Sequence, residues 1–253
     1  MHFFKINFLL RSLMVFFMVS IGLPGICIPE NSSLPILEGI IEASETVELG
    51  TQSPGIVDKI LVERGDYVKK GQKVILLKSD LEKIAVRLAK AQVEFYKRKL
   101  ERSQVLFQKK LAAEIKKDEL ETELKIRRLE LEKARELLKL KTIRSPVDGV
   151  VLKRLVSPGE YVEETVQMLV ITQLNPLNVE VIAPVDLLEK IKKGMKARII
   201  PESPVEGEYQ ATVTIVDQVV DAASGTFGIR LRLPNPDLSI HAGLKCKVSF
   251  IGE

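Results

Sequence analysis

Two stretches of the chain, residues 55–77 and 149–171, alternate apolar and polar residues, turn at a glycine followed by an acid, and resume with β-branched and aromatic residues. This alternation is typical of short strands joined by tight turns. Aligned without a gap, the stretches share eight of 23 residues, including the turn glycines Gly65 and Gly159. The match indicates that one small β-unit occurs twice, although any two amphipathic hairpins share some of this pattern.

The glycines Gly65 and Gly159 stand where a tight turn requires positive φ, which glycine adopts at little cost. A lone β-hairpin is marginally stable in water, whereas two facing copies bury their apolar faces against each other. We therefore expect the two stretches to form one sandwich.

Residues 80–141, between the copies, contain neither Gly nor Pro and repeat apolar residues every 3.5 to 4 positions. This period predicts amphipathic helix of the coiled-coil type, with Ser79 as the N-cap. The expected buried seam of the first half consists of Leu81, Ile84, Leu88, Ala91 and Phe95. The expected seam of the second half consists of Leu120, Leu124, Leu131, Ala134 and Leu138.

This helical stretch fits either one long helix or two antiparallel ones. The flanking β-copies can meet only if the chain returns to its starting point, so we expect a hairpin with arms of roughly 28 residues, each about 42 Å long. The second helix begins either after Ala113, which makes the arms equal, or at Asp118, which forms a capping box with Glu121. We favour the first alternative by symmetry.

The expected tip of this hairpin is basic. Eight basic residues and two acids, Glu101 and Glu114, lie between positions 97 and 117. The basic residues are Lys97, Arg98, Lys99, Arg102, Lys109, Lys110, Lys116 and Lys117. Such a cluster either binds a partner or keeps a helix surface solvated, and both interpretations stay open.

A third region begins near residue 174. Alternating residues predict strands at 178–184, 196–202, 212–220, 228–234 and 244–250. A short helix is expected between the first two of these strands, at 185–194, with Gly194 as its stop.

The first 27 residues have a basic start and an apolar run, residues 13–23, followed by Pro and Gly. Because this run is short for a bilayer span, the segment predicts a secretory signal peptide. An uncleaved membrane anchor is the alternative. Lys5 and Arg11 supply two of the four net positive charges of the chain. The remaining charge is too small to indicate nucleic-acid binding.

Catalytic and metal-binding chemistry finds little support in the sequence. The two cysteines are Cys27, in the predicted signal segment (the leader, residues 1–27), and Cys246. We expect Cys246 to be a small buried apolar residue. The two histidines are His2 and His241, so no metal site built from His and Cys is expected. No nucleotide-binding or nucleophile motif occurs. The polar trio Asp221, Ser224 and Thr226 lacks a base, so we expect turn residues there, no enzyme activity and no cofactor.

Two lipoyl-like half-motifs split by a helical hairpin and followed by a β-region resemble the periplasmic adaptor (membrane fusion, HlyD-like) family of efflux pumps and type I secretion systems. The stretches 143–151 and 219–250 are similar to its second half-motif and to its β-barrel signature. The resemblance implies a mainly β fold with an α-helical coiled-coil hairpin: a split biotinyl/lipoyl-like barrel-sandwich hybrid plus a β-barrel domain. The implied domains are a signal peptide (1–27), sandwich halves (28–79 and 142–173), a hairpin (80–141) and a barrel (174–253).

The resemblance also implies a function. The chain would be a periplasmic adaptor that forms a homo-oligomeric ring and links an inner-membrane transporter, of the resistance-nodulation-division (RND) or ATP-driven (ABC) type, to a TolC-like outer-membrane channel. Family members that dock on such channels carry Arg, then Leu four residues later, then Ser seven after that; here these positions hold Arg102, Leu106 and Ala113. The sequence ends at Glu253 directly after the barrel region, so we expect no further membrane-proximal domain.

Two other classes of function are weaker alternatives. A lipoyl or biotinyl carrier would need a modified lysine on the turn between the half-motifs, but Lys78 directly precedes the expected helix start. A basic coiled-coil scaffold would bind anionic lipid or nucleic acid through the tip. We favour the adaptor.

Overall fold

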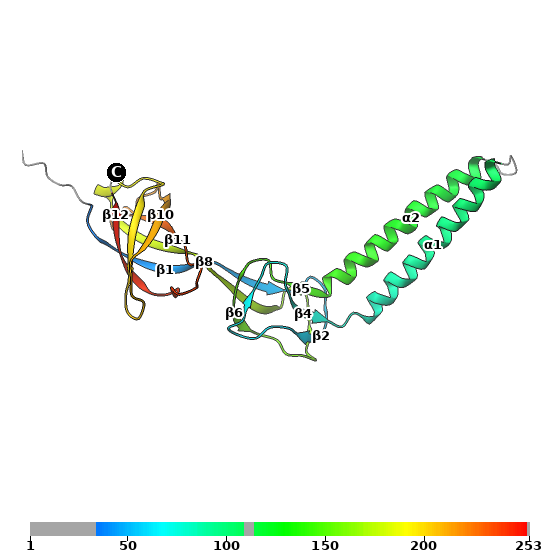
Figure 1. The fold of residues 1–253 in the computed structure, drawn as a ribbon, viewed down its shortest axis with the longest axis horizontal. Helices are drawn as coiled ribbons and strands as arrows, with labels where there is room; N and C mark the ends of the chain where they lie inside the picture. The colour runs from blue at the N-terminus through cyan, green and yellow to red at the C-terminus, as the bar shows by residue number, and fades with distance from the viewer. Residues whose placement is uncertain (1–33, 109–113, 252–253) are drawn as a thin grey trace, which may run out of the picture. The chain divides into compact units, whose positions relative to one another are not determined.

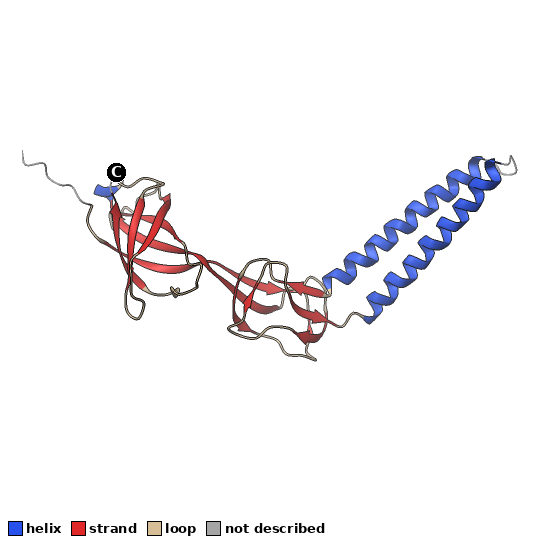
Figure 2. Cartoon of the chain, viewed as in Figure 1, coloured by secondary structure: helices blue, strands red, loops and turns tan. Residues whose placement is uncertain are grey.

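The computed structural model describes residues 34–108 and 114–251, and within them a mainly β protein with one helical hairpin (Figure 1 and Figure 2). The predicted fold class is confirmed. The strands are β1 (Leu37–Gly50), β2 (Gly55–Ile60), β3 (Tyr67–Val68), β4 (Lys73–Leu77), β5 (Thr142–Arg144), β6 (Gly149–Arg154), β7 (Tyr161–Val162), β8 (Gln167–Pro184), β9 (Lys196–Pro201), β10 (Tyr209–Val216), β11 (Thr226–Leu233) and β12 (Lys245–Ile251). The helices are α1 (Asp80–Gln108), α2 (Glu114–Leu140) and the 3₁₀ helix η1 (Val185–Leu187).

The two sequence repeats interlock as a pseudo-symmetric pair. Strand β2 of the first copy pairs with β7 of the second, and β3 of the first pairs with β6 of the second. The backbone contacts repeat as well: the amide of Gly65 donates to the carbonyl of Val151 at 2.9 Å, and the amide of Gly159 donates to that of Val57 at 2.8 Å. Each copy therefore completes the sheet of the other, because neither could satisfy its strand edges alone.

The apolar positions of both copies meet in one core. Its buried residues are Leu49, Val57, Val62, Val68, Val74, Ile75, Leu77, Ile143, Val151, Val156, Val162, Met168, Leu169 and Ile171. The predicted sandwich of two repeated units is confirmed.

The turn glycines have the backbone conformation that the repeat predicted, with φ of 94° at Gly65 and 88° at Gly159. A Cβ at either position would meet no atom within 4 Å, so backbone conformation alone opposes a side chain. We expect Gly65→Val and Gly159→Val each to lower the free energy of unfolding by more than ~1 kcal/mol, because a β-branched residue is strained at positive φ. Thermal melts of both variants measure this, and unchanged midpoints would contradict it.

The third region forms a closed barrel of six strands in the order β1-β12-β9-β10-β11-β8, which the pairing of β1 with β8 closes. Inward positions alternate along each strand; the pattern is clearest in β9, where every second residue is buried. This barrel has its own apolar core, which includes Val179, Ile199 and Leu231.

The prediction of a helix at residues 185–194 is wrong. Only η1 forms, and the chain continues in turns, with the amides of Leu188 and Lys190 donating to carbonyls three residues back. The segment connects the end of β8 to the start of β9 and packs Leu187 and Ile191 into the barrel core, and this tertiary packing overrides the local helical pattern.

Strands β1 and β8 are long, with 14 and 18 residues, and pair with each other from Gly39 and Val181 to Gly50 and Gln167. Both take part in the barrel and in the sandwich. The expected domain limit between residues 173 and 174 therefore falls within a single strand, β8.

Candidate functional site

The helical hairpin carries the predicted site residues. Helix α1 begins at Asp80, and the carbonyl of Ser79 accepts the first helical hydrogen bond, from Lys83, so Ser79 occupies the N-cap position. Helix α2 begins at Glu114, as the symmetric alternative predicted. The two arms, of 29 and 27 residues, have nearly equal length.

The predicted seam of α2 is confirmed, because its five residues face α1 and are buried or half-buried. The predicted seam of α1 is wrong: its residues lie on the exposed side of the helix. The face that packs against α2 consists instead of Val86, Ala89, Val93, Tyr96, Leu100 and Ser103.

Helix α1 thus has two stripes with heptad spacing. At 100° per residue, the centres of the two stripes are roughly 150° apart around the helix. The inner stripe contains Ala89 and Ser103, whose small side chains permit close packing of the helices. Periodicity alone detects both stripes but does not say which one α2 covers.

The outer stripe of α1, defined as Leu81, Ile84, Leu88, Ala91 and Phe95, is left without a partner in the described chain. The exposed fractions of its large side chains are 78% for Leu81, 51% for Ile84, 61% for Leu88 and 53% for Phe95. An exposed row of this size on one helix is typical of an interaction surface.

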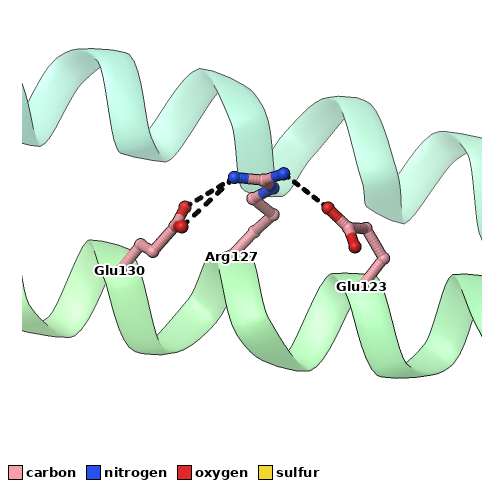
Figure 3. A network of polar contacts seen from close by, with 3 residues as sticks. All are labelled: Glu123, Arg127 and Glu130. Carbon is pink, nitrogen blue, oxygen red and sulfur yellow. Dashed lines mark hydrogen bonds and ion pairs between the residues drawn. The ribbon is translucent and has the colours of Figure 1, made fainter.

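Arg127 interrupts the apolar seam of α2. Its guanidinium bonds Glu123 at 2.5 Å and Glu130 at 2.9 Å on the same helix (Figure 3), and lies 5.3 Å from the ring centre of Tyr96 on α1. Hydrogen bonds that the guanidinium donates to Glu130, Glu123 and Tyr96 raise the pKa of Arg127, so it stays charged. In coiled coils a polar residue at one seam position helps to specify the register of the paired helices, and here Arg127 lies over Tyr96 of the facing helix.

Two of the three predicted docking residues lie near the end of α1. Arg102 and Leu106 are both exposed and lie one helical turn apart on neighbouring positions of one face. Ala113 lies outside the described residues. The structure therefore places Arg102 and Leu106 together and leaves the third position a prediction.

The surface around Arg102 is basic in the part of the tip that is described. Three of the lysines are in ion pairs: Lys97 with Glu101 at 4.0 Å, Lys116 with Glu119 at 2.5 Å, and Lys117 with Glu121 at 3.5 Å. These pairs are largely exposed and contribute little to stability. They do reduce the local charge.

The hairpin is joined to the sandwich by a buried lysine. Lys141, which follows α2, donates to the carbonyl of Pro54 at 2.7 Å and pairs with Glu82 of α1 at 3.4 Å. Lys78, the attachment residue that a carrier would need, is exposed in the segment between β4 and α1, where its amide donates to the carbonyl of Ile56 at 2.8 Å. Lys78 therefore lies in a segment bound to β2 rather than on a free turn.

The remaining candidates for chemistry have structural roles. Cys246 is buried, and burial, followed by the charge of Glu202, raises the pKa of its thiol to about 11, so it stays protonated. Asp221 accepts the amide of Ala223 at 2.8 Å, and hydrogen bonds of this kind lower its pKa, while Ser224 bonds Thr226. These are turn residues, as predicted.

Within residues 34–108 and 114–251, no group of three or more His, Cys, Asp or Glu side chains could hold a metal ion. In the same part of the chain, no helix has the length and apolar character of a membrane span.

The sandwich decides the family. The model of the CzcB-like barrel-sandwich hybrid domain matches residues 45–173, half of the chain, including both repeats and the hairpin between them. The chain belongs to the CzcB-like barrel-sandwich hybrid family. The predicted resemblance to membrane fusion proteins is thereby confirmed.

Relatives of this CzcB-like protein are distant. The cobalt-zinc-cadmium resistance protein CzcB of Cupriavidus metallidurans is 22% identical over 82% of this chain and 43% of its own length. The multidrug/solvent efflux pump periplasmic linker protein MepA of Pseudomonas putida is 25% identical over 84% of this chain and 61% of its own. An uncharacterized protein of Haemophilus influenzae is 19% identical over 76% of this chain and 50% of its own length. The chain thus spans about half the length of the curated relatives it matches.

Solved structures support the same fold. A MacA–MexA chimera that contains the α-hairpin domain of Pseudomonas aeruginosa MexA has a TM-score of 0.72, with 21% identity over 85% of this chain and 80% of its own. The membrane fusion protein Spr0693 of Streptococcus pneumoniae has a TM-score of 0.69, with 15% identity over 87% of this chain and all of its own. At these identities the comparison shows the fold alone.

Proposed function

We propose that this CzcB-like protein is a non-enzymatic periplasmic adaptor that joins an inner-membrane transporter to a TolC-like outer-membrane channel in an efflux or secretion system. One observation carries the proposal: a helical hairpin is inserted between two halves of a barrel-sandwich hybrid, in a chain whose relatives include efflux pump periplasmic linkers. The adaptor couples the conformations of its partners and seals a conduit, and it does not transform a substrate.

The location follows from the leader. Residues 1–27, which lie outside the described residues, direct the chain to the periplasmic side of the inner membrane, where the barrel and sandwich would lie near the transporter. The transporter is of the RND or ABC type. The CzcB relative is named for cobalt, zinc and cadmium resistance and MepA for multidrug and solvent efflux, so the names of the relatives do not agree on one cargo.

The outer stripe of α1 supports the proposal that the adaptor is a ring of identical copies. A second hairpin packed against this stripe would cover four large apolar side chains that the chain's own α2 leaves exposed. Burial of each such side chain typically contributes about 1.5–3 kcal/mol to association. Neighbouring hairpins would then form a continuous sheath.

We expect Leu88→Glu to weaken self-association by about tenfold or more while leaving thermal stability nearly unchanged, because Leu88 is 61% exposed in the single chain. Lys90→Glu, two residues away on an exposed position off the stripe, is the control and should associate normally. Sedimentation velocity over a concentration series measures both. Equal association of Leu88→Glu and the unmodified chain would exclude this stripe from the contact between copies.

The docking proposal is tested by site-specific photo-crosslinking in cells. A photoreactive residue at Leu106, exposed near the hairpin end, should form a crosslink to an outer-membrane channel protein that mass spectrometry identifies. The same residue at Lys153, exposed on β6 of the sandwich, should not. Crosslinks of equal yield at both positions, or none to an outer-membrane protein from Leu106, would refute channel docking.

A further inference from the structure

One end of the barrel gathers four separate segments of the chain. Strand β12 ends beside the start of β9, where Ile251 pairs with Lys196, and β1 enters the barrel antiparallel to β12 with Leu37 opposite Val248. Strand β8 ends at Pro184 opposite Thr226, the first residue of β11. We call this end the barrel cap and define it as residues 34–37, 182–196, 215–226 and 251.

The two loops of the barrel cap contact each other. The amide of Val185, after β8, donates to the carbonyl of Gly225, before β11, at 3.0 Å, and the amide of Gly194 holds the first loop to β10 by donating to the carbonyl of Val213 at 2.9 Å. A groove of about 620 Å³ lies between the loops, lined by residues that include Leu188, Lys193 and Ile215. The cap is therefore one continuous surface.

Exposed apolar side chains concentrate on this cap. Val219 is 82% exposed, the largest exposed fraction among the large apolar residues of the described chain, and Ile182 is 71% exposed. The full set is Ile36, Ile182, Val185, Ile215, Val219 and Ile251. The barrel core does not need these residues, so their clustering at one end indicates a surface that another apolar phase covers.

Four exposed lysines lie on the same cap: Lys190, Lys192, Lys193 and Lys196. The acids at this end are Asp186, Glu189, Asp217 and Asp221, and the carboxylate of Asp221 is held by the amide of Ala223. Glu189 and the three aspartates equal the lysines in number, so the cap has no net formal charge. Lysine side chains are long and extend their ammonium groups past neighbouring apolar residues. The cap therefore presents ammonium groups beside exposed aliphatic side chains and carboxylates.

The chain enters this end of the barrel directly from the leader. Eleven positions separate Leu34 from the end of the apolar run 13–23. They reach at most about 36 Å when fully extended. The sequence thus joins the leader to the chain at the barrel cap, where Leu34 and β1 begin.

We propose that the barrel cap binds the surface of an anionic lipid bilayer. Apolar side chains beside lysines form the combination that segments in the membrane interface use, in which apolar groups enter the headgroup layer and lysines bind lipid phosphates. Val219 and Val185 supply the inserted groups, and Lys190, Lys192 and Lys193 supply the phosphate contacts. This inference goes beyond the proposed function and does not depend on the hairpin docking on a channel.

The test is hydrogen exchange and flotation of the full chain with vesicles of phosphatidylglycerol and phosphatidylethanolamine, and with neutral phosphatidylcholine vesicles. The anionic vesicles should slow exchange at residues 185–195 and 217–225 and leave the hairpin unchanged. Binding should fall at least tenfold between 0.05 and 0.5 M salt, because screening weakens lysine–phosphate attraction. Neutral vesicles should bind at least tenfold more weakly.

A matched pair of variants separates the cap from general charge and from the leader. The cap variant is Lys190→Gln, Lys192→Gln, Lys193→Gln and Val219→Ser, and the control is Lys90→Gln, Lys125→Gln and Lys133→Gln on the hairpin, with the same loss of charge. The cap variant should bind anionic vesicles at least tenfold more weakly, and the control should bind as the unmodified chain does. Equal binding by both variants, or protection at the hairpin tip instead of the cap, would overturn the inference. Because no transporter or channel is present, that failure would leave the adaptor proposal standing.

Discussion

Arg102→Asp should abolish transport and leave the fold intact. Arg102 is exposed on α1, 22 residues from the first residue of that helix, Asp80, and so about 33 Å along it. A charge reversal there meets neither the sandwich core nor the seam with α2. If the tip docks on a channel, the planar guanidinium of Arg102 donates to acidic or carbonyl groups while Leu106 supplies the apolar contact, and reversal turns that attraction into repulsion.

Transport assays and channel crosslinking at low and high salt measure this effect. Docking guided by a basic tip should weaken as salt rises, because the charges are exposed. Arg128→Asp makes the same charge change at an exposed position in the interior of α2 and should retain transport. Undiminished crosslinking by Arg102→Asp would remove the docking role of this residue and leave the adaptor fold standing.

Gly149→Ala should lower the free energy of unfolding by about 2–4 kcal/mol, the largest stability effect we expect from a single methyl group in this chain. A Cβ on Gly149 would lie 2.5 Å from the carbonyl oxygen of Thr172 and 2.9 Å from its carbonyl carbon. Both atoms are backbone atoms of β8, which pairs with β6, so neither strand can move without loss of ladder hydrogen bonds.

The first copy of the repeat provides the control. Gly55 is the equivalent of Gly149, yet the nearest atoms to a Cβ there are side-chain atoms: the ammonium of Lys141 at 3.4 Å and two carbons of Leu77 at 3.8 and 3.9 Å. Gly55→Ala should therefore change the free energy of unfolding by no more than about 0.5 kcal/mol. Denaturant unfolding of the pair checks the contrast, and equal losses would show that the close approach of β6 to β8 is not the cause.

The sequence by itself determined the elements whose signals are local or repeated. Two copies of one β-unit with glycine at equivalent turns predicted the sandwich, because a turn at Gly65 or Gly159 depends on the φ preference of that residue and its neighbours. The Gly- and Pro-free stretch predicted the helices, and the need for the β-copies to meet predicted the return of the chain. Arg102 and Leu106 were identified from a family resemblance at fixed spacing, and the exposure of both is consistent with it.

Only the tertiary structure decided which faces are covered. Helix α1 has two apolar stripes of equal period, and the choice of Ala89 over Leu88 for the inner face depends on what α2 presents, which no local pattern records. The length of β8 was not predicted for a related reason: one strand serves two cores, and the partners that it pairs with along its length are set by long-range contacts. The barrel cap is also a tertiary feature. Strand register brings the N-terminal end of β1, the lysines after β8 and Val219 after β10 to one end of the barrel. That register is set by long-range pairing, which no local pattern records.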